Sequence, residues 1–158
     1  MHLSAPIYQR LKHQHHAILP LISGLSKERM NYRISPEKWS IHDNIAHLAK
    51  YQPVFIERIH TILKENNHEF GRYRAEDDPE FETWRSWNTD KLLEKLDHHR
   101  EIILELTEPL TQEQLKRVGI HKKFGNLTLE KWLEFFLLHE AHHIFIIFQL
   151  ANDVDIKA

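Results

Sequence analysis

The chain contains no cysteine, and this absence excludes several classes of chemistry at once. Disulfide bonds, thiolate metal sites, iron–sulfur clusters and a cysteine nucleophile all require the missing side chain. Only four glycines and six prolines interrupt the 158 residues, and no strand-like alternation of apolar and polar residues extends over a useful length. We therefore expect an all-α protein with long helices.

The charge is nearly balanced, with 21 basic and 23 acidic side chains and a formal net charge of −2. This balance indicates neither a nucleic-acid partner nor a polybasic membrane signal. Residues 1–10 show no signal peptide, so we expect a cytoplasmic protein. The stretch 127–150 is apolar enough to suggest a membrane span. Its four charged side chains and three histidines instead predict a buried bundle helix or a dimer interface, with no membrane partner.

Apolar residues recur at the helical period in four stretches, residues 5–24, 40–65, 89–107 and 128–151. Gly24 is expected to end the first helix. Ser40 begins the second, since its Ser-x-x-Asp spacing to Asp43 resembles a capping box, and Pro53 should kink it. Thr128 should cap the fourth. These four helices predict one four-helix bundle domain covering residues 1–158.

The connection between the second and third predicted helices, residues 66–88, is long and crossover-like. Its acidic run, Glu76 to Glu80, is expected only to solvate the loop. The segment Arg72-Tyr73-Arg74 could meet an anionic substrate. The chain's four tryptophans are expected first to pack at helix ends, although they are large enough to line a pocket; they are Trp39, Trp84, Trp87 and Trp132.

Three of the fourteen histidines have unusual surroundings. His139 and His143 lie four residues apart in a very apolar part of the fourth helix, so both project from one face, about 6 Å apart along the axis. Buried imidazoles must find partners, and one divalent cation would satisfy both. His47 lies at the edge of the second helix's apolar stripe, and facing bundle helices can bring such residues to a shared ion. Three imidazole ligands would leave coordination positions open for water or substrate.

The segments around these histidines resemble the two signatures of the DinB/YfiT-like metal-binding proteins. The first signature, a Trp-Ser pair opening the second helix and a later His-Leu pair, is matched by Glu37-Lys38-Trp39-Ser40-Ile41 and His47-Leu48. The second, a His-x-x-x-His on the fourth helix, is matched by the segment 138–143. The resemblance spans essentially the whole chain in helix order and spacing. It implies a four-helix bundle, usually dimeric, that binds one divalent ion such as zinc, nickel or iron through His47, His139 and His143.

The same resemblance implies a metal-dependent hydrolase or a thiol S-transferase acting on a small molecule, without choosing between them. The ion would either lower the pKa of a bound water or hold a small thiol as its thiolate. Because the chain has no cysteine, that thiol would be a low-molecular-weight cosubstrate. A non-catalytic metal-binding or stress-related bundle stays open as an alternative, and so does a bundle that binds no metal.

Two other kinds of metal site match parts of this pattern. The segment 139–143 reads H-E-x-x-H, which in zincin peptidases makes the glutamate, here Glu140, a general base. The fifteen residues after it contain neither histidine nor glutamate as a third ligand, only Asp153 and Asp155 near the helix end. A di-iron carboxylate site would use two E-x-x-H motifs, at Glu57 and Glu140, but the first helix lacks the glutamate it requires.

Glu140 itself has three possible roles. It is a candidate base on a metal-bound water, a partner behind the ligands, or an ion-pair partner of a neighbouring helix. His142 is expected at the boundary of the helix, and His42 is expected to be exposed. His13, His15 and His16 on the first helix should form a polar boundary facing solvent or a dimer partner, or supply one donor behind the ligands.

Overall fold

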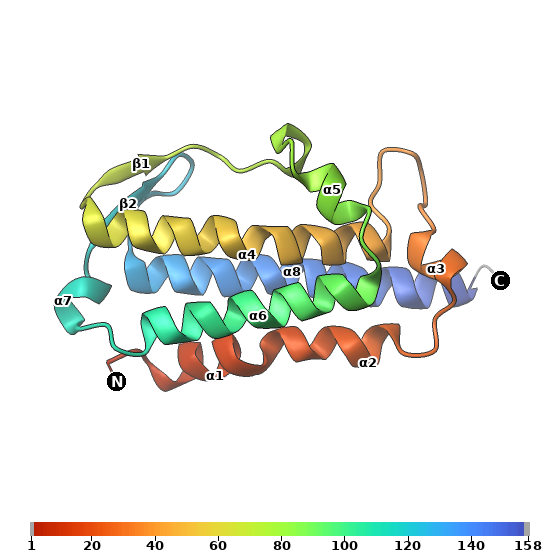
Figure 1. Ribbon diagram of the computed structural model, residues 1–158, viewed down its shortest axis with the longest axis horizontal. Helices are drawn as coiled ribbons and strands as arrows, with labels where there is room; N and C mark the ends of the chain where they lie inside the picture. Colours follow the sequence, from red (N-terminus) through yellow and green to blue (C-terminus); the bar gives the residue numbers. More distant parts are fainter. Residues whose placement is uncertain (1, 157–158) are drawn as a thin grey trace.

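Four helical segments lie side by side in the computed structural model, which describes residues 2–156 and side chains through Asn152 (Figure 1). The first wall of the bundle consists of three pieces in sequence, α1 (Ala5–His13), the 3-10 turn η1 (Gln14–Ala17) and α2 (Ile18–Ile22). The other three walls are α4 (Ile41–Lys64), α6 (Thr89–Thr107) and α8 (Leu129–Ile156). The predicted all-α four-helix bundle is confirmed.

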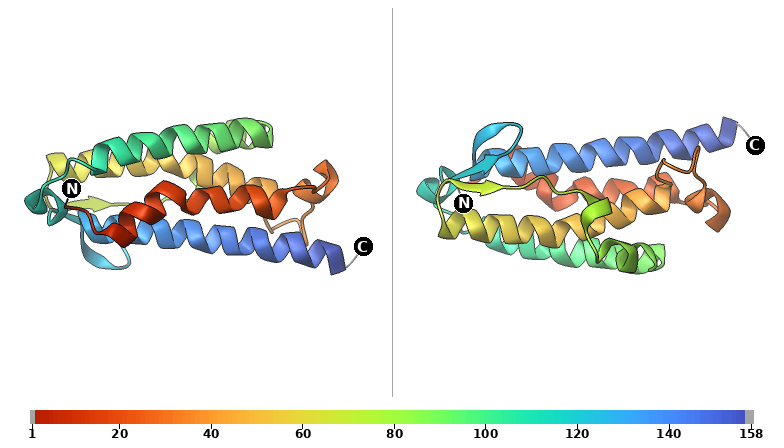
Figure 2. Two further views of the ribbon diagram at one scale, coloured as in Figure 1. Left: turned by 90° about the horizontal axis from the view of Figure 1, so that it is seen from below. Right: turned by 90° about the horizontal axis from the view of Figure 1, so that it is seen from above.

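The connection between α4 and α6 runs back along the bundle, because these two helices point in the same direction (Figure 1). The first wall and α8 point the other way, as the two further views show (Figure 2). The returning connection carries β1 (His68–Phe70), the 3-10 turn η2 (Ala75–Asp77) and α5 (Phe81–Arg85), and α5 packs against α4. The predicted long crossover is therefore present, and it covers one side of α4.

The predicted helix starts are confirmed by their caps. Ser40 Oγ accepts a hydrogen bond from the Asp43 amide at 3.1 Å, and the Asp43 carboxylate accepts one from the Ser40 amide at 2.8 Å. Helix α4 continues through Pro53. Thr128 Oγ1 accepts from the amide of Lys131 at 3.3 Å, which caps α8. Helix α8 then extends past its predicted end near residue 151.

The first helix is interrupted, contrary to the prediction of one helix over residues 5–24. The turn η1 separates α1 from α2. Pro20 explains the interruption, because in a continuous helix its ring would clash with the carbonyl four residues earlier. Gly24 adopts a left-handed conformation with φ of 78° and ends the segment as predicted. The short helix α3 (Lys27–Asn31) follows.

A three-stranded sheet closes one end of the bundle, although no strand was predicted. β1 pairs in parallel with β2 (Val118–His121), which pairs antiparallel with β3 (Gly125–Thr128). Strands of three or four residues are too short for a detectable alternation, and β1 is remote in sequence from β2. The sheet joins the start of the crossover to the segment between α7 (Gln112–Leu115) and α8.

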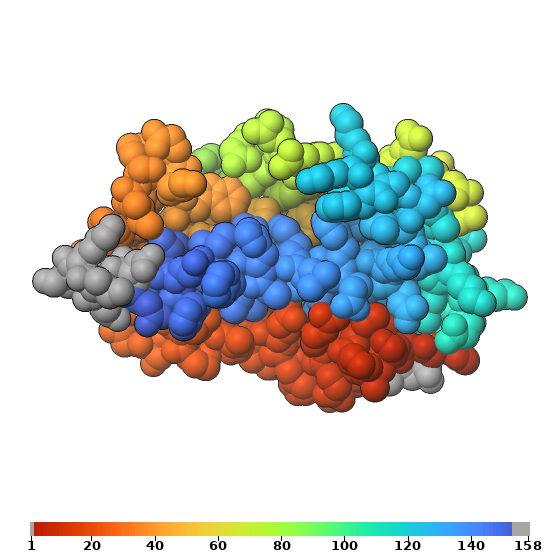
Figure 3. Space-filling view, turned by 180° about the vertical axis from the view of Figure 1, so that it is seen from behind, coloured from red at the N-terminus to blue at the C-terminus, as the bar shows by residue number. Residues whose placement is uncertain are grey.

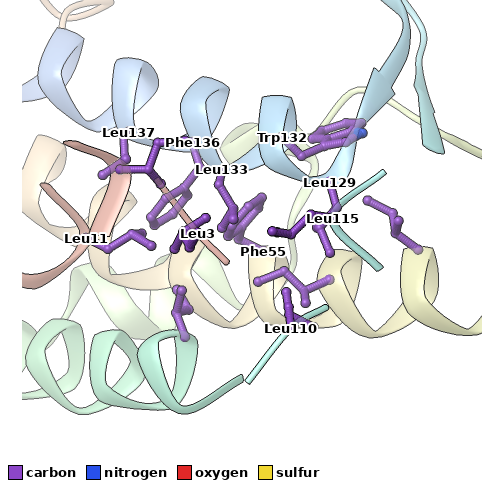
Figure 4. Packing of buried hydrophobic residues seen from close by; sticks show 14 of the residues in the cluster. Leu3, Leu11, Phe55, Leu110, Leu115, Leu129, Trp132, Leu133, Phe136 and Leu137 are labelled. Carbon is purple, nitrogen blue, oxygen red and sulfur yellow. The ribbon is translucent and has the colours of Figure 1, made fainter. Parts of the chain in front are cut away.

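Buried apolar side chains form two clusters along the bundle axis. In the cluster nearer the sheet, the rings of Phe55 and Phe136 stack with centroids 4.3 Å apart (Figure 4). The other cluster includes Ile45 and Ile147. His47 contacts an aromatic ring from each cluster, Tyr51 and Phe81, so it lies where the two clusters meet.

Gly119 in β2 lies where a side chain does not fit. A Cβ there would be 2.7 Å from Trp132 Nε1 and 2.9 Å from two side-chain atoms of Ile62. The indole is fully buried and donates to the Gly119 carbonyl at 3.1 Å, so it cannot easily move. We expect Gly119→Ala to lower the free energy of unfolding by about 1–3 kcal/mol, measured by urea denaturation. Gly71→Ala, whose Cβ would meet nothing within 4 Å, is the control, and an equal loss there would contradict the explanation.

The outer face of α8 is apolar and exposed, and it crosses the middle of the molecule in the view from behind (Figure 3). Leu138, Phe145 and Phe148 are 55%, 57% and 46% exposed. By length and composition, Leu129–Asn152 could cross a membrane, and only a third of its most apolar window is buried. One such helix is weak evidence for a membrane. The homodimer and the cytoplasmic location stay predictions.

Candidate metal centre

The three predicted ligands, His47 on α4 and His139 and His143 on α8, come together between the two apolar clusters. One nitrogen from each ring lies within 4.8 Å of the others. The Nε2 atoms of His47 and His139 are 3.1 Å apart. Two nitrogens bound about 2.0–2.1 Å from one tetrahedral ion lie about 3.3 Å apart. The spacing therefore suits two ligands of a single ion.

Asn44 fixes the orientation of the third imidazole. It lies one turn before His47 and is buried. Its amide nitrogen donates to the Ser40 carbonyl at 2.8 Å, so its Oδ1 is the atom that faces His143 Nδ1, also at 2.8 Å. Because Oδ1 can only accept, His143 carries its proton on Nδ1 and keeps its lone pair on Nε2. A neighbour that fixes the tautomer of a histidine in this way is usual behind metal ligands.

The three imidazoles are held in the neutral form. Burial lowers the pKa of His47 to about 2, that of His139 to about 4 and that of His143 to about 3. Among the described residues, the buried Nδ1 atoms of His47 and His139 have no hydrogen-bond partner. Because an ion at this spacing would bind the two Nε2 atoms, each Nδ1 would keep its proton. Neutral imidazole is the form that binds a divalent ion, and these residues fit one.

Aromatic rings line the cluster on several sides. The Trp39 ring lies 4.9 Å from that of His47 and 6.0 Å from that of His143, measured between centroids. The Tyr51 ring lies 4.7 Å from that of His139. Tyr73, from the crossover, stacks on His47 at 6.0 Å. Trp39 is thus part of the site, in addition to its predicted packing at a helix end.

A family model of the DinB superfamily matches residues 10–147. The chain belongs to the DinB superfamily. This confirms the resemblance inferred from the Trp-Ser and His-x-x-x-His segments. The uncharacterized protein YuaE of Bacillus subtilis is 28% identical over 140 residues, which cover 78% of this chain and 83% of YuaE.

Two solved structures of Bacillus subtilis proteins share the fold of this DinB protein. YfiT from Bacillus subtilis, described as a probable metal-dependent hydrolase with an unusual four-helix bundle topology, superposes with a TM-score of 0.81 at 19% identity. That match covers 95% of this chain and 86% of YfiT. The DinB-like protein YjoA gives a TM-score of 0.59 at 18% identity, covering 95% of this chain and 92% of YjoA.

The acidic run of the crossover does more than solvate a loop, contrary to the prediction for this DinB chain. The buried Lys50 of α4 donates to Glu80 at 2.8 Å and lies 3.4 Å from Asp78. The Tyr73 hydroxyl donates to Asp78 at 2.9 Å. These bonds fasten the crossover to α4 and hold Tyr73 against His47. The two neighbouring arginines, Arg72 and Arg74, are exposed.

Glu140 is paired away from the histidines. Its carboxylate forms an ion pair with Arg100 of α6, both residues being 1% exposed, and it accepts a hydrogen bond from Gln14 at 3.0 Å. Within the described part of the chain, the ligand atoms that converge come from the three histidines and not from this carboxylate. Of the roles left open, this arrangement favours the ion pair with a neighbouring helix. A catalytic role for Glu140 stays a prediction.

The described residues do not assemble the competing di-iron site. Glu57 and His60, which a di-iron site would need, are both exposed on α4. The side chains of Asp153 and Asp155, considered as zincin ligands, lie outside the described residues. His142 is exposed, as expected for a boundary residue.

Two histidines expected to be exposed or at the boundary are buried. His42 Nδ1 lies 3.1 Å from Thr89 Oγ1, and its Nε2 lies 2.9 Å from the Arg85 carbonyl, because the crossover covers that side of α4. His15 is buried beside Leu11 and Ile18, which lie four residues before it and three after it, whereas His13 and His16 stay exposed. The burial of His42 could not be predicted from the helical period, because it depends on the remote crossover.

The lowered pKa values make stability depend on pH in a defined direction. Unfolded histidines titrate near pH 6.5, whereas folded His15, His47, His139 and His143 titrate at about 2 to 4. As the pH falls below about 6.5, the unfolded chain binds protons that the folded chain does not. The folded state should lose up to about 1.4 kcal/mol per pH unit for each histidine.

Urea denaturation of the metal-free protein between about pH 7 and pH 5 measures this dependence. We expect the free energy of unfolding to fall toward the acid end. His47→Gln should give a shallower slope, because it removes one of the four groups. A flat profile over this range would contradict the burial of neutral imidazoles.

Proposed function

We propose that this DinB protein binds one divalent ion through His47, His139 and His143 and uses it to hydrolyse a small-molecule substrate. The observation that carries the proposal is the convergence of three neutral imidazoles, with the Nε2 atoms of His47 and His139 3.1 Å apart. The description of YfiT, which shares the fold, as a probable metal-dependent hydrolase supports the same reaction class.

The coordination shell would stay open toward a substrate. The two side chains that could have closed it are directed elsewhere, since Glu140 is paired with Arg100 and His142 is exposed. Three protein ligands with a vacant position are typical of catalytic zinc sites, whereas structural sites use four. This favours a catalytic ion over one that only stabilises the bundle.

The bound ion would supply a Lewis acid that lowers the pKa of water and polarises the substrate. The protein's own residues supply orientation and a dry environment. Asn44 holds the His143 tautomer, and the Trp39 and Tyr73 rings exclude water from one side of the cluster. Burial raises the pKa of Tyr51, which keeps its hydroxyl protonated. Arg58 donates to the Tyr51 oxygen at 3.2 Å, so the hydroxyl proton is not used in that bond.

A thiol S-transferase is the second candidate function. The open position of a three-histidine ion can hold a thiolate as well as hydroxide. Because the chain has no cysteine, no protein thiol would compete with a cosubstrate thiol for the ion. The thiol would then be a low-molecular-weight cosubstrate.

The test begins with protein purified without a histidine tag and without added metal. Elemental analysis should find close to one equivalent of zinc, nickel or iron. Small ester, amide and phosphoester substrates are then assayed with and without glutathione, cysteine or coenzyme A. Turnover without thiol, lost on chelation and restored by metal, supports the hydrolase. Turnover that requires thiol supports the transferase. Protein that binds no divalent ion even when it is supplied overturns both.

A further inference from the structure

A chain of buried polar groups crosses the bundle beside the histidine cluster, with Arg100 of α6 at its centre. Its guanidinium donates to Gln52 Oε1 at 3.2 Å, to the Leu11 carbonyl at 2.9 Å and to His15 Nδ1 at 3.1 Å. It also forms the ion pair with Glu140. These partners come from α4, α1, η1 and α8, so a single side chain bonds all the other walls of the bundle.

The direction of these hydrogen bonds fixes which nitrogen of His15 carries its proton. A guanidinium can only donate, so His15 Nδ1 accepts and its Nε2 carries the proton. Nε2 lies 3.2 Å from Asp97 Oδ1. His15, His16 and Asp97 have ligand atoms close enough to suggest a second metal site. This site is disfavoured, because His15 would have to lose its Nε2 proton while Arg100 occupies its other nitrogen.

This series of buried polar groups meets α8 at the level of the proposed metal ligands. Glu140 directly follows His139 and lies less than one turn before His143. Gln14 bonds α8 twice, since its Nε2 lies 3.0 Å from Glu140 Oε1 and 2.9 Å from the Leu137 carbonyl. Both the backbone and a side chain of α8 are thus held from outside, within two residues of His139.

The rotation of α8 decides whether the ligand nitrogens converge. An imidazole nitrogen projects about 5–6 Å from a helix axis, so a rotation by about 20° moves it by about 2 Å. Metal–ligand distances tolerate changes of only about 0.2 Å. Apolar contacts do not set rotation this finely, because they are non-directional. Hydrogen bonds and an ion pair are directional, and here they act at the required level of the helix.

We propose that Arg100, Glu140 and Gln14 are positioning residues that set the rotation of α8, so that His139 and His143 meet His47 at the spacing of one divalent ion. This inference rests on the proposed metal binding. It assigns to the buried ion pair a role that packing alone would not require, since apolar pairs of similar volume often stabilise a core equally well.

The test compares affinity for Zn²⁺ with the absorption spectrum of bound Co²⁺, which reports the coordination geometry. In Arg100→Met/Glu140→Leu, an apolar pair replaces the ion pair. We expect Zn²⁺ affinity, measured by competition with a chromophoric chelator, to fall by about 10–100-fold, with an altered Co²⁺ spectrum. Gln14→Ala removes only the two hydrogen bonds from this partly buried side chain to α8, and it should weaken Zn²⁺ binding several-fold. This variant replaces the double variant in the test if the double variant does not fold.

Ile62→Ala is the control, since Ile62 is fully buried in the cluster nearer the sheet and outside this chain of bonds. It should lower stability and leave both the Zn²⁺ affinity and the Co²⁺ spectrum unchanged. A folded Arg100→Met/Glu140→Leu protein, or failing that Gln14→Ala, with wild-type affinity and spectrum would overturn the positioning role and leave the proposed function intact. Equal weakening in Ile62→Ala would also overturn it. Wild-type protein that binds no ion would instead overturn the proposed function.

Discussion

His47→Ala is expected to abolish stoichiometric metal binding, with affinity for Zn²⁺ falling by more than about 100-fold. Residues behind metal ligands typically contribute about 10–100-fold, and His47 is itself a proposed ligand. It is also the only member of the cluster on α4, so its loss leaves two ligands on a single helix. Elemental analysis after dialysis should give close to one equivalent of ion for the wild type and close to none for the variant.

The matched control for this loss is His142→Ala. His142 adjoins His143, with ring centroids 5.4 Å apart, but it is exposed and lies outside the cluster. It should retain the wild-type metal content. His139→Ala and His143→Ala should behave like His47→Ala, and circular dichroism should show that all four variants keep their helix content. Full metal content in His47→Ala would refute the site, and metal loss in His142→Ala would place the ion elsewhere.

Arg100→Met is expected to cause the largest loss of stability, about 3–5 kcal/mol in urea denaturation. The substitution leaves the Glu140 carboxylate buried with only Gln14 as a donor among its described hydrogen-bond partners. It also removes the donor to Gln52, to the Leu11 carbonyl and to His15. An uncompensated buried charge is costly, whereas a paired one can be nearly neutral.

The double variant Arg100→Met/Glu140→Leu separates the cost of an unpaired charge from loss of packing. We expect it to recover most of the stability lost in the single variant, because no buried charge is left without a partner. The single variant Glu140→Leu completes the cycle and gives the coupling between the two side chains. Losses that simply add across the two positions would show that the pair does not interact as the structure indicates.

The proposed ligands could be predicted from sequence, and their convergence in the fold agrees with that prediction, because their pattern is local. His139 and His143 share a helix face by their spacing alone, and the Trp39-Ser40 pair places His47 in register within α4. The sequence signals for the helix starts were equally local, as the Ser40–Asp43 capping box shows. Both kinds of signal depend on neighbours within about one or two turns.

The features that the sequence did not reveal depend on parts of the chain remote from one another. His42 is buried because the crossover lies over it, and β1 is recognisable only through its pairing with β2. One missed residue did leave a signal. Arg100 occupies the inward stripe of α6, and the residues that share this stripe are otherwise mostly apolar: Leu92, Leu96, Ile103 and Thr107. A single arginine in such a stripe indicates a buried partner.

Helix α8 carries two of the three proposed ligands and follows every other element of the fold. While the chain is being synthesised, His47 would therefore face an incomplete cluster until the final helix has docked. One imidazole alone binds divalent ions weakly, so partly folded chains would gain little from metal. A ligand that binds only the native state stabilises only that state. Ion uptake would then report completed assembly, and its rate during refolding would follow the docking of α8.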